Sequence, residues 1–193
     1  LDKICKKGQY SLVVPKNASN IPHLNNIPVI KFGKAKGSIW EQTFFALYMI
    51  THPRCISLNL LTIMPVWKPG IICIHDMSYR THPEYCKTFY MKVSRYWHIF
   101  QEELARRFSP LLFTVSEYSK KQMMESLKLP SDNIVVLGNG WEHFKEVIAD
   151  KTLKERHPDW FATPFFFSLG SLAPNKNNKP RSEERRVGKE CRS

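Results

Sequence analysis

The sequence predicts an α/β protein with a Rossmann-like open parallel sheet. Short apolar runs without polar alternation recur along the chain, and helical patterns separate them. Strands with this composition are buried on both faces, as in a parallel sheet that helices cover. The length of 193 residues and the hydrophobic content of 42% suffice for one ordinary domain core but not for two full α/β domains.

Six runs rich in β-branched or aromatic residues are predicted to be strands. They cover residues 11–14, 28–32, 71–75, 111–115, 134–137 and 165–168. The first five belong to a domain that we expect over residues 1–140. Residues 141–163 are interpreted as a linker with a short helix over 145–156, and residues 164–180 as the first strand and loop of a second domain.

Three helical patterns lie between these strands. The first is expected to open at Ser38, with Glu41 as the reciprocal member of a capping box, and to reach about residue 50. The second covers about 86–108, and the third follows Ser116 as its N-cap and ends near residue 130. The second pattern predicts an amphipathic helix whose apolar side holds Phe89, Val93, Tyr96, Trp97 and Phe100, with Lys92, Arg95 and Glu102 elsewhere.

The composition limits the classes of protein that need to be considered. The five cysteines include no C-x-x-C pair and accompany no histidine cluster, so we expect no metal site, no disulfide framework and a reducing cytoplasmic location. The longest apolar stretches are broken by residues such as Pro53 and Pro65 before they could span a membrane. The net charge of +12 suits nucleic acid, an anionic membrane surface or a phosphorylated ligand.

Residues 181–193 form a segment without helical or strand periodicity. Their alternative interpretations are a solvated basic tail and a translated sequencing adapter, which they resemble closely, and we exclude them from the fold. Without this segment, Lys+Arg falls from 29 to 24 and Asp+Glu from 17 to 14, which leaves a charge of +10. The natural chain is expected to continue beyond Lys179.

Polar residues that directly follow predicted strands are the first candidates for a site, because ligands of open α/β sheets bind at the carboxyl ends of the strands. His75 and Asp76 follow one strand, Ser116 follows the next, and Asn139 and Gly140 follow the third. A structural histidine, an ordinary N-cap and a plain turn are the respective alternatives.

A fourth such loop covers residues 169–177. Gly170 there permits close approach of the backbone, and Lys176 can meet a phosphate as a point charge. The loop lacks the P-loop pattern, so hydrolysis of nucleoside triphosphates gains no support.

Taken in order, these motifs resemble glycosyltransferase family 4, especially its bacterial surface-polysaccharide branch. The resemblance spans about residues 28–179. It is carried by Gly37-x-x-Trp40-Glu41-Gln42, Ile74-His75-Asp76 with Pro83-Glu84, Thr114-Val-Ser116-Glu-Tyr-Ser119-Lys120, Asn139-Gly140-Trp141-Glu142 and Leu169-Gly170-Ser-Leu-Ala-Pro174-Asn-Lys176-Asn177.

The resemblance implies a GT-B fold, of which residues 1–140 would be the acceptor-side N-terminal domain. It implies that His75 lies against the transferred sugar as the catalytic candidate and that Lys176 neutralises the donor diphosphate. Gly170, Asn139 and Gly140 would help to bind the donor. Asp76, Ser116 and Glu41 are the acceptor-side candidates.

The implied reaction is transfer of a sugar, with retention, from a nucleoside diphosphate sugar to a glycan or lipid-linked acceptor. No metal and no further cofactor is implied, and the basic charge suits peripheral contact with an anionic membrane at the inner face. Ser171 departs from the family pattern, since many relatives carry Arg there. The chain is expected to lack the first strand and most of the donor half, and to be inactive alone.

Two other functions remain open from the residues. The first is a non-catalytic basic Rossmann-like module that binds nucleic acid. Glutamates scattered among the basic and aromatic residues argue against a continuous binding stripe, so no nucleic-acid partner is expected. The second is a GT-B-like sugar-nucleotide epimerase, which the Pro174-x-Lys176-Asn177 element disfavours.

Overall fold

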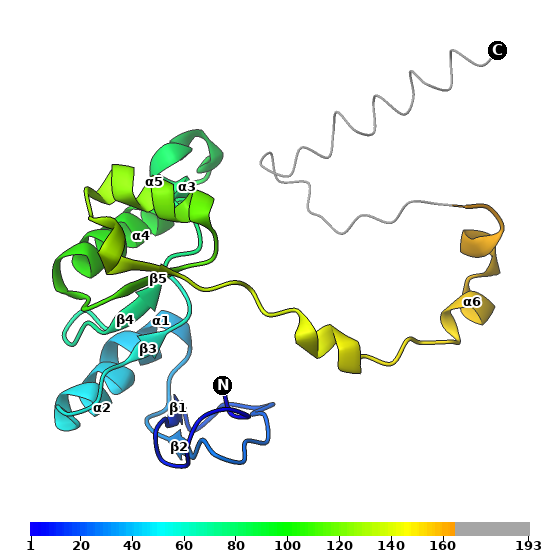
Figure 1. Cartoon of the computed structure of the whole chain (residues 1–193), viewed down its shortest axis with the longest axis horizontal. Coiled ribbons are helices and arrows are strands. Elements are labelled where there is room, and N and C mark those ends of the chain that lie inside the picture. The colour runs from blue at the N-terminus through cyan, green and yellow to red at the C-terminus, as the bar shows by residue number, and fades with distance from the viewer. Residues whose placement is uncertain (165–193) are drawn as a thin grey trace. The chain divides into compact units, whose positions relative to one another are not determined.

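The computed structural model describes residues 1–164 of the chain (Figure 1). The chain divides into two compact units, the first of which is Leu1–Asn139, while the second begins at Gly140. The predicted strand at 165–168 and the loop with Gly170 and Lys176 lie outside the described residues.

The first unit holds a four-stranded sheet in which every pair of neighbours is parallel. Its order is β3 (Leu58–Asn59), β4 (Ile71–Cys73), β5 (Leu112–Thr114) and β6 (Ile134–Val136). A separate parallel pair joins β1 (Leu12–Val14) to β2 (Val29–Lys31). The mixed α/β class and the parallel sheet are confirmed, and the arrangement is compatible with a Rossmann-like open sheet. Strand β3 was not predicted, because two residues give no periodicity to recognise.

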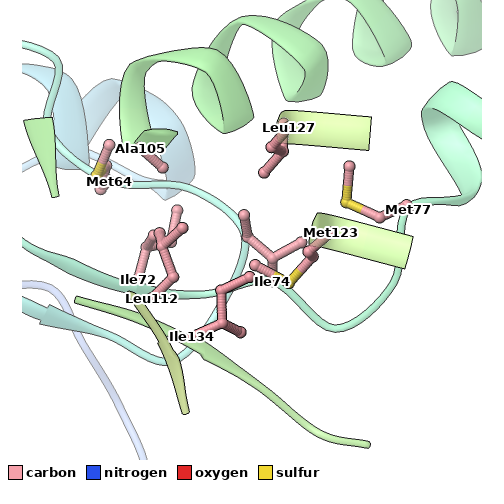
Figure 2. Close-up of a cluster of buried hydrophobic side chains, with 9 residues drawn as sticks. All are labelled: Met64, Ile72, Ile74, Met77, Ala105, Leu112, Met123, Leu127 and Ile134. Atoms are coloured by element: carbon pink, nitrogen blue, oxygen red, sulfur yellow. The ribbon is translucent and has the colours of Figure 1, made fainter. Parts of the chain in front are cut away.

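Helices α4 (Phe89–Phe108) and α5 (Glu117–Leu127) cover one face of this sheet (Figure 1). Ile72, Leu112 and Ile134 stand side by side in the register of β4, β5 and β6, and all three are buried. Figure 2 shows these side chains in one cluster with others from the helices and connections, namely Met64, Ile74, Met77, Ala105, Met123 and Leu127. This cluster is the hydrophobic core.

The opposite face of the sheet is less completely covered. On this face, Cys73 of β4 pairs with Phe113 of β5, and Phe113 pairs with Val135 of β6. Cys73 is buried, but Val135 is 38% exposed. The prediction that the strands are buried on both faces is therefore confirmed for the face under α4 and α5 only.

The first helical region contains α1 (Gly37–Trp40), a π-helical turn (Glu41–Phe45) and α2 (Ala46–Thr51). The predicted capping box was wrong, because the helix begins at Gly37 and Lys36 precedes it without a side-chain cap. Ser38 therefore lies inside the first turn, where its hydroxyl cannot act as the N-cap.

This region is tied to β2 by close packing. Trp40 Nε1 donates to the Phe32 carbonyl at 2.7 Å. Gly33 has φ +67°, and a Cβ added there would lie 2.1 Å from Phe44 Cγ, so only glycine fits.

Short elements precede α4, which starts three residues later than predicted. They are α3 (Ser78–Thr81) and a 3-10 turn (Pro83–Tyr85). Thr88 caps α4 by accepting a hydrogen bond from Met91 N. Ser116 caps α5 as predicted, with Ser119 N donating to its Oγ at 3.1 Å.

The predicted apolar side of α4 was wrong. Phe89, Val93, Tyr96 and Phe100 are exposed, whereas the buried residues of the helix are Gln101, Glu102 and Ala105. The small Ala105 side chain lets the helix lie close to the sheet, and Gln101 and Glu102 each accept one side-chain hydrogen bond inside the protein. The longest helix of the described residues is thus oriented by a polar layer.

The second unit contains short elements. They are a 3-10 turn (Glu142–Glu146), α6 (Leu153–Arg156) and another 3-10 turn (Pro158–Phe161). The helix predicted over 145–156 forms only at its end. Asp150 Oδ1 accepts a hydrogen bond from Thr152 N at 3.0 Å, and this turn precedes the first residue of α6. Over residues 1–164, no helix combines the length and hydropathy that crossing a bilayer requires.

The alternation along β6 provides a test of the core. Replacing Ile134, which is 1% exposed, by alanine is expected to lower the free energy of unfolding by about 2–5 kcal/mol, because a cavity forms beneath α5. The same change at the adjacent Val135 is expected to cost clearly less. Urea midpoints of the two variants measure the difference, and equal losses would contradict the assignment of the two faces.

Candidate functional site

The carboxyl ends of β4, β5 and β6 form one edge, held by hydrogen bonds that extend past the strands. Ile74 N donates to the Phe113 carbonyl at 2.8 Å, and Leu137 N donates to the Thr114 carbonyl at 2.7 Å. The buried Thr114 hydroxyl donates to the Ile74 carbonyl at 2.7 Å. These bonds fix the backbone directly before His75, the first residue beyond the β4 ladder that carries an ionisable side chain.

The half-buried His75 ring is held by the loop that follows β3. His75 Nε2 lies 2.9 Å from the Leu60 carbonyl. A carbonyl can only accept, so Nε2 carries the proton in this arrangement and Nδ1 of the neutral ring remains an acceptor. Nδ1 has no partner within residues 1–164. The ring is therefore fixed at one nitrogen and open at the other.

Ser116 is connected to His75 through Ser119. Ser116 Oγ donates to Ser119 Oγ at 3.0 Å, and Ser119 Oγ in turn donates to the His75 carbonyl at 2.9 Å. The structure thus brings these two predicted residues to one place. The hydroxyl of Ser116 is occupied by capping α5, which agrees with the plain N-cap alternative.

Asp76 starts the turn that leads into α3. Its Oδ1 accepts from Ser78 N at 2.8 Å, and the residue is exposed. Burial lowers the pKa of His98 in α4, and the negative charge of Asp76 opposes this shift. Burial raises the pKa of Glu102, and the charge of Asp76 adds a smaller upward contribution. Asp76 connects the end of β4 to the start of α3.

A polar layer between α3 and α4 was missed by the sequence analysis. Glu102 is fully buried, and its Oε2 accepts from Arg80 Nε at 2.6 Å. Arg95 Nε donates to the Tyr79 carbonyl at 2.7 Å, and the Tyr79 ring stacks on His98 with centroids 4.3 Å apart. We call these residues the α3–α4 polar layer. One feature of the sequence could have indicated that Glu102 is buried. It lies three residues before the small Ala105, so the two share one side of the helix.

Burial shifts the pKa of two side chains in this layer. It raises the pKa of Glu102, while the hydrogen bond and charge of Arg80 oppose the rise. It lowers the pKa of His98, with Asp76 opposing. The layer therefore favours a neutral imidazole beside the loop that carries His75 and Asp76.

Gln101 and Gln42 fix the connection between β3 and β4 from two sides. Gln101 Oε1 accepts from Met64 N at 3.2 Å. Gln42 Nε2 donates to the Met64 carbonyl at 2.9 Å, and its Oε1 accepts from Val66 N at 3.0 Å. The loop that begins with Leu60 is thereby anchored near its middle.

Glu41 and Asn139, the other predicted residues of the first unit, make no hydrogen bond to this group. Glu41 begins the π-helical turn, and its pKa is raised by burial, but its side chain makes no hydrogen bond or ion pair with any residue from 1 to 164. Asn139 and Gly140 are exposed after β6, where the first unit ends. Gly170 and Lys176 lie outside the described residues.

The cysteines and acidic residues form no metal centre in the part of the chain that the structure describes. Cys73 and Cys86 are buried as free thiols, and burial raises the pKa of Cys73.

Comparisons with known proteins add no relative: no protein-family model matches the chain, and no curated protein matches it. The resemblance to glycosyltransferase family 4 thus rests on the motif residues quoted above and stays a prediction.

The raised pKa of Glu102 makes a prediction about stability. Between the ordinary pKa and the raised one, the folded state holds a proton that the unfolded chain has released, so stability falls as pH rises through this range. Glu102→Gln cannot titrate there. We expect the wild type to lose stability relative to Glu102→Gln as pH rises above the ordinary carboxyl pKa of 4.5.

Urea midpoints of both proteins across this range measure the effect. Glu125→Gln, at an exposed site of α5, is the matched control. A stability difference between wild type and Glu102→Gln that stays constant with pH would show that Glu102 titrates normally.

Proposed function

We propose that this chain is the acceptor-side part of a retaining GT-B glycosyltransferase of the family 4 type. The enzyme would transfer a sugar from a nucleoside diphosphate sugar to a glycan or lipid-linked acceptor. The observation that carries the proposal is His75, fixed at the sheet edge through Nε2 with Nδ1 left open. An acceptor nitrogen held at the carboxyl end of a parallel strand suits recognition of a sugar hydroxyl.

The chemistry follows from this geometry. A hydroxyl of the transferred sugar would donate to His75 Nδ1, while the Leu60 carbonyl keeps the ring in one tautomer and one orientation. In the reaction, the bond from the anomeric carbon to the diphosphate breaks and a bond to the acceptor oxygen forms. The proton of the acceptor hydroxyl passes to the nucleoside diphosphate, which leaves. Lys176, Gly170, Asn139 and Gly140 are proposed for the donor side, and Asp76, Ser116 and Glu41 for the acceptor side. The proposed mechanism needs no metal or further cofactor.

The proposed location is the cytoplasm, with peripheral contact at the inner face of the membrane. The net charge, +12 for the whole sequence and +10 without residues 181–193, supports this part of the proposal, because anionic lipids attract basic surfaces and lipid-linked acceptors lie in the bilayer.

The role of His75 is tested in the full-length protein that contains this sequence, by release of nucleoside diphosphate from a panel of nucleotide sugars with lipid-linked acceptor. His75→Ala is expected to lower kcat/KM about ten- to hundredfold, the value of a lost hydrogen bond to the substrate. His23→Ala, at an exposed histidine, is expected to change nothing. No release with any donor, or equal rates for both variants, would overturn the proposal.

A further inference from the structure

Helix α4 carries an apolar stripe on the surface of the first unit. Phe89, Val93, Tyr96 and Phe100 are 83%, 52%, 66% and 46% exposed. Their spacing of four, three and four residues puts them on one side of a helix, along about 16 Å of its length. We call these four residues the α4 stripe.

The helix cannot rotate to bury the stripe without breaking its polar anchors. Glu102 is fixed by Arg80 on the opposite side, and Gln101 is bonded to the Met64 backbone. Separating Glu102 from Arg80 would leave a buried charge without its partner, which is strongly destabilising. The stripe therefore faces outward as a consequence of how α4 is anchored.

The border of the stripe is basic. Lys87, Lys92 and Arg107 are exposed, and none forms a salt bridge within the described residues. Lys87 and Lys92 lie near the first turn of α4, and Arg107 lies near the last. The acidic residues of the helix do not offset them, because Glu102 is buried and Glu103 is paired with Arg106 and Arg80.

We infer that the α4 stripe docks on an anionic phospholipid surface. Phe89, Val93 and Phe100 would enter the boundary between headgroups and acyl chains, and the Tyr96 hydroxyl would stay among the headgroups. The basic border would then meet lipid phosphates. This inference rests on the membrane contact proposed above and is independent of sugar transfer.

The charges favour this occupant over two others. A second copy of the chain would bring the same basic border against itself, and like charges repel. Single-stranded nucleic acid stacks on aromatic rings along a basic groove, whereas the stripe lies on the convex surface of a helix and contains Val93.

The test is co-sedimentation of the full-length protein with vesicles of phosphatidylcholine containing about 30% phosphatidylglycerol, and with vesicles of phosphatidylcholine alone. The stripe variant is Phe89→Ser/Val93→Ser/Phe100→Ser. Its matched control is Ile39→Ser/Leu47→Ser/Tyr118→Ser, which removes three exposed apolar side chains from other helices.

We expect salt-sensitive binding of the wild type to the anionic vesicles only. The stripe variant is expected to bind at least about a hundredfold more weakly, because it lacks the three apolar side chains that would enter the lipid. The control variant is expected to bind like the wild type. Circular dichroism reports whether each variant is folded. Carbene footprinting of the wild type is independent of any variant, and anionic vesicles should protect residues 87–108 in it.

Charge reversal separates the border from the overall charge. Lys92→Glu/Arg107→Glu is expected to weaken binding at least about tenfold, and Lys34→Glu/Lys121→Glu, at exposed sites elsewhere, to weaken it less. Equal binding of the stripe and control variants, or no protection of residues 87–108, would overturn the inference. Stripe-dependent binding of a thymidine oligonucleotide that exceeds binding to vesicles, or a dimer that buries the stripe without lipid, would also overturn it.

The two proposals fail separately. With a soluble acceptor, the stripe variant is expected to keep the transfer rate of the wild type, and His75→Ala is expected to keep the binding to vesicles. Loss of sugar transfer without loss of sedimentation therefore concerns only the proposed role of His75. Loss of sedimentation without loss of transfer concerns only the docking of the α4 stripe.

Discussion

The hydrogen-bonded junction between β4 and β5 is the constraint on which the candidate site depends. The buried Thr114 hydroxyl bonds the Ile74 carbonyl, and Ile74 N bonds the strand beside it, so the backbone that enters His75 has little freedom. Ser119 then holds the His75 carbonyl from the first turn of α5. Strand, neighbouring strand and helix thus fix one residue from three directions, which is the preorganisation that a binding group requires.

The α3–α4 polar layer has two effects that follow from one arrangement. It supports the segment after His75, because Arg80 and Tyr79 of α3 are held by Glu102 and Arg95 of α4. It also sets the rotation of α4, so that the helix buries a charged pair and exposes aromatic rings. Burying Glu102 costs desolvation, as its raised pKa reflects, and the bond to Arg80 offsets part of that cost. Because the Glu102–Arg80 pair sets the rotation of α4, the α4 stripe on the opposite side of the helix is exposed.

Much of the first unit could be predicted from sequence because its signals are local. The apolar runs predicted β1, β2, β4, β5 and β6 to within two residues at either end. Ser116 correctly indicated where α5 begins. The failures concern information that is not local. The hydrophobic period predicted the wrong side of α4, since the partner of Glu102 lies 22 residues upstream in the chain. Nothing near His75 in sequence indicates that its ring bonds the Leu60 carbonyl.

The orientation of the His75 ring is the central claim, and its tautomer tests it most directly. A long-range nitrogen–proton correlation spectrum of isotopically labelled protein distinguishes the two neutral tautomers, and loss of the signal in His75→Asn assigns it. The account predicts a ring protonated at Nε2, with Nδ1 free to accept, at a pH where the ring is neutral. A ring protonated at Nδ1 would contradict it, because the bond to Leu60 could not form and no acceptor would face a sugar hydroxyl.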